Sequence, residues 1–203
     1  MSSEAAFGAR PGSGRVERVK ARLLAAICLC GALAGADAAA RVFLTQTEAL
    51  HLAFPDGVSV ERKAAFLTAA QQDETKKLAH CPDPPDALVA YYVGTRDGKV
   101  VGTAYFDTHR VRTMPETIMV LVDPAGSVAR VEVLSFQEPE DYLPLPAWYA
   151  QFPGRPLDDT LSLKRAIRPV AGATLTTNAT TDAVRRVLAL HRVLGAGTEG
   201  AAK

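Results

Sequence analysis

Runs of apolar residues separated by short turn sequences dominate the second half of the chain. Asp97-Gly98 is typical of the two-residue turn of a β-hairpin, and Asp123-Pro-Ala-Gly-Ser127 is a longer connection of the same kind. Two hairpins in succession predict an antiparallel sheet of at least four strands. Their apolar runs lie at 87–93 and 100–106, and at 117–122 and 128–134.

Helical signals occupy the segment before residue 86. Thr45-Gln-Thr-Glu48 resembles a capping box, so we expect a short helix that Pro55-Asp-Gly57 ends. A second helix is predicted from Ser59 to about Ala79, before the proline-rich stretch 80–85. Later in the chain, residues 162–167 suggest one more strand or an extended lead into the loop that follows. The predicted fold class is α+β.

A loop of small residues leads into the last predicted helix. Gly172 and Ala173 allow close backbone approach and unusual torsions, and the Thr174 hydroxyl follows them. Thr176, Thr177 and Asn178 are candidate N-caps, so we expect the helix to begin near Thr177. A helix N-terminus that faces such a loop favours an anion, although an ordinary turn before a surface helix has the same pattern. The apolar face comprises Ala183, Val184, Val187, Leu188, His191 and Leu194.

The first 38 residues have the organisation of an export signal. Basic residues from Arg15 to Arg22 precede an apolar run from Leu23 to Ala36, and small residues at 36–40 offer cleavage sites. The run of 14 residues is shorter than the ~20 residues that a membrane span needs. We therefore expect a secretory signal, with an uncleaved membrane anchor as the alternative.

Composition narrows the function classes. The 203 residues carry a net charge of +1 with no concentrated basic field, which argues against a nucleic-acid partner. Beyond the signal, Cys81 is the only cysteine, so an intramolecular disulfide is excluded there. The motifs of serine hydrolases, P-loop nucleotide hydrolases and zinc proteases do not occur. We expect no catalysis by side chains alone.

A polar connection between the two predicted hairpins, residues 107–116, gathers His109, Arg112 and Glu116. These side chains are candidates to contact a phosphate or the edge of a flavin, because arginine pairs well with phosphate. The alternative is a solvated connection without function. The proline-rich stretch 136–146, with the aromatic residues that follow it, is suited either to cover a planar ligand or to cover the core.

The sequence Ala171-Gly-Ala-Thr-Leu-Thr-Thr-Asn-Ala179, after a hairpin of the form found at 118–134, resembles the FMN-binding domain family. Known members are periplasmic flavin subunits of the sodium-pumping NADH:quinone reductase and of the Rnf complex. The resemblance covers roughly Val89 to Leu194. It implies that a dedicated FMN transferase attaches FMN through its phosphate to Thr174.

The resemblance also assigns the neighbouring residues. Gly172, Ala173, Leu175, Thr176 and Thr177 would surround the phosphate or the flavin. Further candidate contacts, from the residues themselves, are His109, Arg112 and Glu116 of the connection 107–116. Two positions depart from the family pattern, because Arg168 replaces an acidic residue and Ala171 replaces Ser or Thr. Both covalent and non-covalent FMN therefore remain open, with Arg168 as a candidate to hold the phosphate of free FMN.

The resulting expectation is an electron carrier rather than a stand-alone enzyme. It would pass electrons between membrane-bound redox proteins, in the periplasm or at the outer face of the cytoplasmic membrane. The alternative is a cofactor-free interaction or assembly subunit of an envelope redox complex. The expected organisation is an export signal at 1–38, a helical segment at 39–85, an FMN-binding domain at 86–194 and a flexible tail at 195–203.

Overall fold

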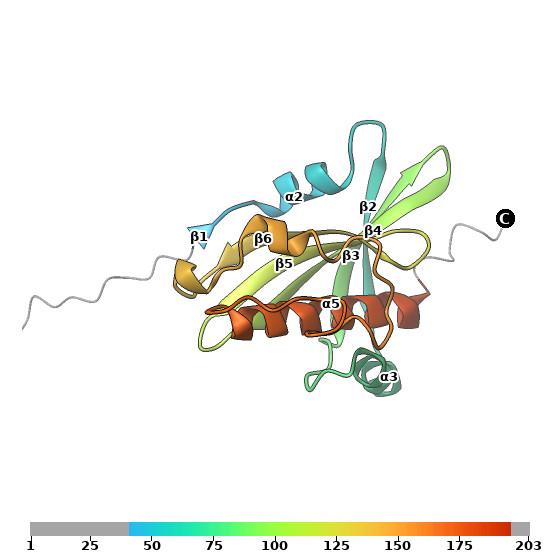
Figure 1. The fold of residues 1–203 in the computed structure, drawn as a ribbon. Helices are drawn as coiled ribbons and strands as arrows, with labels where there is room; N and C mark the ends of the chain where they lie inside the picture. Colours follow the sequence, from blue (N-terminus) through green and yellow to red (C-terminus); the bar gives the residue numbers. More distant parts are fainter. Residues whose placement is uncertain (1–40, 196–203) are drawn as a thin grey trace, which may run out of the picture. The chain divides into compact units, whose positions relative to one another are not determined.

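The computed structural model describes residues 41–195. The predicted export signal and residues 196–203 of the predicted tail lie outside these described residues. Within the described range, six strands form one antiparallel sheet in the order β1-β6-β5-β4-β3-β2. Figure 1 shows α5 lying along the sheet and α3 beside α5. The strands are β1 (Arg41–Val42), β2 (Ser59–Phe66), β3 (Leu88–Arg96), β4 (Lys99–Arg110), β5 (Pro115–Val122) and β6 (Val128–Phe136).

The α+β class and both predicted hairpins are confirmed. Strands β3 and β4 pair across Asp97-Gly98, and β5 and β6 pair across the 123–127 connection. The helices are α2 (Gln46–Ala53), α3 (Ala69–Ala79), α4 (Pro146–Tyr149) and α5 (Thr174–Leu194), and a short 3-10 helix, η1, spans Glu140–Tyr142. The Thr45 capping box of α2 is present as predicted.

The sheet separates two apolar cores. Ile118, Val120 and Val122 of the central strand β5 face a core shared with α5, whereas Met119 and Leu121 face a smaller core shared with α2. Successive residues of a strand point to opposite faces, so a strand covered on both sides becomes an unbroken apolar run. Figure 1 shows α5 and α2 on opposite sides of the sheet.

The predicted helix over 59–79 is wrong in its first part. Residues 59–66 form the edge strand β2, which pairs with β3 along its whole length. The helix α3 begins only after Thr68, whose capping box with Gln71 ends the strand segment and starts the helix. Pairing with a strand that lies about 30 residues away in sequence overrides the local helical pattern. The segment 39–85 therefore contains strands as well as helices.

Two further local predictions are corrected. The stretch 162–167 is not a strand but a series of turns, with a single bridge between Leu163 and Ile167 and a positive φ of 65° at Lys164. Strands β4 and β5 extend through most of the predicted connection 107–116, leaving a turn in which Val111 N–H donates to Met114 O. His109 and Glu116 are thus paired residues of adjacent strands.

Candidate functional site

The loop before α5 is anchored at Arg168. The backbone N–H of Arg168 donates to Gln151 Oε1 at 2.9 Å, and its carbonyl oxygen accepts from Trp148 Nε1 at 2.6 Å. Trp148 is therefore a support for this loop as well as a core residue. Gly172 then takes a φ of +85°, yet a Cβ there would meet no atom within 4 Å. Glycine is therefore needed at position 172 for its positive φ, and not because another atom approaches the backbone closely.

Helix α5 begins at Thr174, three residues before the predicted start near Thr177. Ala173 occupies the N-cap position and supplies no side-chain acceptor. The N–H groups of the first turn have no intrahelical partners, and the first turn contains no acidic residue. The Thr174 side chain is exposed, and its hydroxyl donates to Val170 O at 3.3 Å. This end of the helix has the local charge that favours an anion.

The other threonines of the first turns are committed to the fold. Thr176 Oγ1 donates to Tyr142 O at 2.6 Å, which ties the helix to η1. Thr177 and Thr181 donate to helix carbonyls three or four residues earlier. This back-bonding explains why Thr177 does not cap the helix, because its hydroxyl is already bonded to a carbonyl oxygen within the helix.

A pocket of about 220 Å³ lies at Thr174. The guanidinium of Arg112 enters it from the β4–β5 turn and lies over the ring of Tyr142, with the Arg112 Cζ atom 4.9 Å from the ring centre. Glu138 fixes this turn by accepting the backbone N–H groups of Thr113 and Met114. These hydrogen bonds, led by that from Met114, lower the pKa of Glu138. The remaining lining residues are Gly172, Ala173, Leu175 and Thr176.

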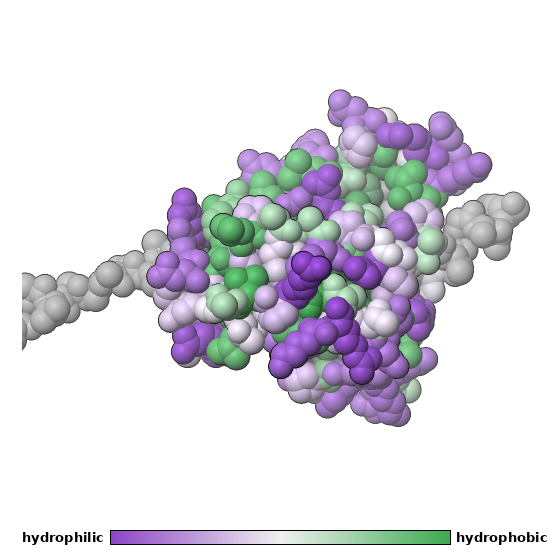
Figure 2. Space-filling model, in the orientation of Figure 1, coloured by the Kyte–Doolittle hydropathy of each residue, from purple (hydrophilic) through white to green (hydrophobic). Residues whose placement is uncertain are grey.

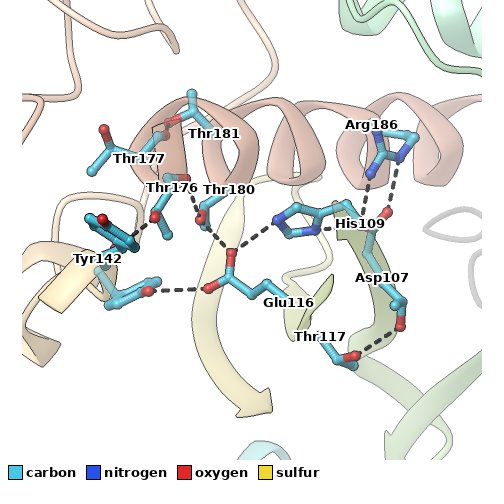
Figure 3. A network of polar contacts seen from close by, with 12 residues as sticks. Asp107, His109, Glu116, Thr117, Tyr142, Thr176, Thr177, Thr180, Thr181 and Arg186 are labelled. Carbon is cyan, nitrogen blue, oxygen red and sulfur yellow. Dashed lines mark hydrogen bonds and ion pairs between the residues drawn. The ribbon is translucent and has the colours of Figure 1, made fainter. Parts of the chain in front are cut away.

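A chain of charged side chains lies behind this pocket, between the sheet and α5 (Figure 3). Glu116 is fully buried, and its Oε2 lies 3.0 Å from His109 Nε2 and 2.8 Å from Thr180 Oγ1. His109 Nδ1 lies 3.0 Å from Asp107 Oδ1. Asp107 in turn accepts two hydrogen bonds from Arg186, at 2.9 and 2.8 Å. We call Glu116, His109, Asp107 and Arg186 the charge chain.

His109 is protonated in this arrangement because both of its ring nitrogens face carboxylate oxygens. Burial alone would lower its pKa, but the hydrogen bonds to Asp107 and Glu116 outweigh burial and raise the pKa to about 9. Burial acts in the opposite direction on Asp107 and would raise its pKa. The hydrogen bonds from His109 and Arg186 outweigh burial and lower the pKa of Asp107. Negative and positive side chains alternate along the charge chain. These four residues therefore link α5 to β4 and β5 without adding net charge.

A second, larger pocket of about 610 Å³ adjoins the charge chain. It is lined by the 82–86 loop, by β3 and β4, and by the side of α5 that carries Asp182 and Arg186. Asp107 and His109 reach its wall, and Leu175 lines both this pocket and the smaller one. Its volume lies within the range of about 300–1,000 Å³ that is usual for small-molecule sites.

The predicted site residues divide into three groups. Six of them line the Thr174 pocket, whereas Thr177 is buried in the helix beside it. Glu116 and His109 belong to the charge chain, and Glu116 contacts α5 through Thr180. Arg168 lies elsewhere, because its side chain lines a separate pocket with Arg155. The six residues that line the Thr174 pocket are Gly172, Ala173, Thr174, Leu175, Thr176 and Arg112.

Sequence reasoning missed several members of the site. Tyr142 comes from η1 and lies under Arg112. Thr180 and Arg186 lie on the polar flank of α5 and meet partners on β4 and β5. In the sequence, the only signal for Thr180 and Arg186 is the spacing of polar residues beside the apolar face of the helix. Polar residues recur there every three to four positions.

Comparisons with known proteins add no family. The chain matches no protein-family model, and no curated protein matches it. Among residues 41–195, no helix is long and apolar enough to cross a membrane. The same residues contain no group of three His, Cys, Asp or Glu side chains placed to hold a metal ion.

Proposed function

We propose that this protein is an exported FMN-binding electron-transfer protein, with FMN attached through its phosphate to Thr174. The observation that carries the proposal is the exposed Thr174 hydroxyl at the uncapped N-terminus of α5, in a pocket that also holds the Arg112 guanidinium. A phosphate there would meet free N–H groups, the positive end of the helix dipole and an arginine.

The surroundings of Thr174 are suited to the two parts of FMN. The pocket of about 220 Å³ accommodates a phosphate but is smaller than usual ligand sites, whereas the adjoining pocket of about 610 Å³ has room for a ring system. Leu175, with an exposed fraction of 55%, lies between them. Bound FMN would supply one- or two-electron transfer, which no side chain of this chain provides. Arg112 and the helix N-terminus would hold its phosphate.

The proposed place in the cell rests on the first 38 residues. A basic segment followed by a short apolar run supports export to the periplasm or to the outer face of the cytoplasmic membrane. The redox partners we propose are membrane-bound proteins, and the proposed attachment requires an FMN transferase.

The decisive experiment is co-expression of the chain with an FMN transferase. We expect a yellow protein whose flavin fluorescence stays with the polypeptide on a denaturing gel, and a mass increase of one FMN minus one water. Thr174→Ala should abolish both signals. Thr181→Ala is the matched control, because the Thr181 hydroxyl is buried, bonds to Thr177 O within the helix and does not line the Thr174 pocket, so this variant should keep the flavin.

Two other outcomes distinguish non-covalently bound FMN from the absence of FMN. Flavin that is bound by the native protein but released on denaturation indicates non-covalent FMN. A colourless wild-type protein refutes the flavin proposal.

A second candidate function is a cofactor-free subunit of an envelope redox complex. The position of Arg168 favours it, because this residue stands where the family has an acid and lies outside the Thr174 pocket. Recovery of the same partner by wild-type protein and by Thr174→Ala protein, both without flavin, would support this alternative. Recovery that depends on bound FMN would contradict it.

A further inference from the structure

A third pocket, of about 620 Å³, is lined by both Arg155 and Arg168. Its walls consist of these two arginines, Gln151 and small residues such as Gly154 and Ala166, and no acidic residue lines it. Figure 2 shows strongly hydrophilic side chains in the middle of the molecular face that includes the loop before α5. We call this cavity the arginine pocket.

Both arginines are held by their backbones and keep guanidinium nitrogens available. Arg168 is anchored through its N–H and its carbonyl oxygen, as described above. Arg155 donates its backbone N–H to Phe152 O and accepts from Val128 N–H, while its Nε donates to Gln151 O at 3.2 Å. Neither guanidinium forms an ion pair with another residue of the range 41–195.

No carboxylate lines the arginine pocket to neutralise this charge. Residues 160–181 contain three basic residues, Lys164, Arg165 and Arg168, and no Asp or Glu. The carboxylate of Asp158 accepts from Thr160 N–H and Oγ1 and from Leu161 N–H, so it is engaged locally. Two guanidinium groups in one concave site without an acid leave an excess positive charge that an anion would balance.

We propose that the arginine pocket binds the phosphate group of a small polar molecule of the sugar-phosphate class. Guanidinium groups match phosphate oxygens with paired hydrogen bonds. The walls contain no aromatic ring on which a flavin or a nucleobase would stack, so recognition rests on the anionic group. The volume of the pocket leaves room for an organic part beyond the phosphate. This site is distinct from the Thr174 pocket and does not depend on FMN.

Isothermal titration tests the proposal on the protein prepared without a transferase. The probes are inorganic pyrophosphate and glucose 6-phosphate, with glucose as the uncharged control. Both anions should bind saturably at a site that depends on Arg155 and Arg168, and glucose should not bind. Arg155→Gln and Arg168→Gln should each weaken binding about tenfold or more, the effect of removing one charge-assisted contact.

Two arginine variants serve as matched controls. Arg112→Gln alters the Thr174 pocket, and Arg165→Gln alters a side chain that donates to Asp159 O outside the arginine pocket. Both should keep the site that Arg155→Gln and Arg168→Gln weaken. Equal weakening in all four variants would show general charge attraction and overturn the proposal. Binding of a poly-glutamate peptide without binding of pyrophosphate would also overturn it, in favour of an acidic protein partner.

Discussion

The charge chain makes a quantitative prediction about His109. Its pKa rises from 6.5 in the unfolded chain to about 9 in the folded protein. At roughly 1.4 kcal/mol per pH unit, protonated His109 stabilises the fold by about 3 kcal/mol. The side chain is only 8% exposed, so solvent screens this effect little.

The sign follows from the direction of the change. Because the folded pKa is the higher one, the stabilisation is complete below pH 6.5 and disappears as the pH rises through about 9. Physically, a neutral imidazole donates from one nitrogen only, so either Asp107 or Glu116 loses its hydrogen bond above that pH.

Urea unfolding of wild-type and His109→Gln protein across this pH range measures the effect. The difference in unfolding free energy should be largest near pH 6 and should shrink by about 3 kcal/mol near pH 10. His51→Gln, on the exposed face of α2, is the control and should change nothing over this range. A wild-type advantage that stays constant from pH 6 to pH 10 would refute the protonated chain.

Three further predictions follow from single residues. Glu116→Ala leaves a buried imidazolium with one partner, so we expect a loss of about 3–5 kcal/mol in urea unfolding, and less for Glu116→Gln. Gly172→Ala should cost about 1–2 kcal/mol in the same assay, because its φ of +85° strains any residue with a Cβ, and an unchanged midpoint would contradict this. Burial raises the pKa of Cys81 to about 12, so its thiol should resist a disulfide reagent at pH 8 until urea unfolds the protein; rapid labelling of native protein would contradict this.

The hairpins were predictable from the sequence because their signals are local. The Asp97-Gly98 turn and the near-continuous apolar run of β5 depend on neighbouring residues and on burial of both faces. The edge strand β2 was not predictable in the same way. Its residues are mostly exposed, and only its pairing with β3 makes it a strand.

The candidate site likewise contains residues that the sequence places together and residues that only the fold brings together. The Gly-Ala-Thr stretch placed Gly172, Ala173 and Thr174 together because they are adjacent in sequence. Arg112 and Tyr142 reach the same pocket from the β4–β5 turn and from η1, and local patterns contain no information about that meeting. The start of α5 also differs from the prediction, since the Thr176 hydroxyl bonds to Tyr142 O and the Thr177 hydroxyl bonds within the helix instead of capping it.

By itself, the sequence determined the α+β class, the two hairpins and the small-residue loop before a long amphipathic helix, because turn chemistry and apolar periodicity are properties of neighbouring residues. Only the tertiary structure decided that His109 and Glu116 are buried partners and that Asp107 meets Arg186. It also separated Arg168 from Thr174, although six positions divide them in sequence. The physical reason is that charge pairing and pocket formation depend on which distant segments pack together.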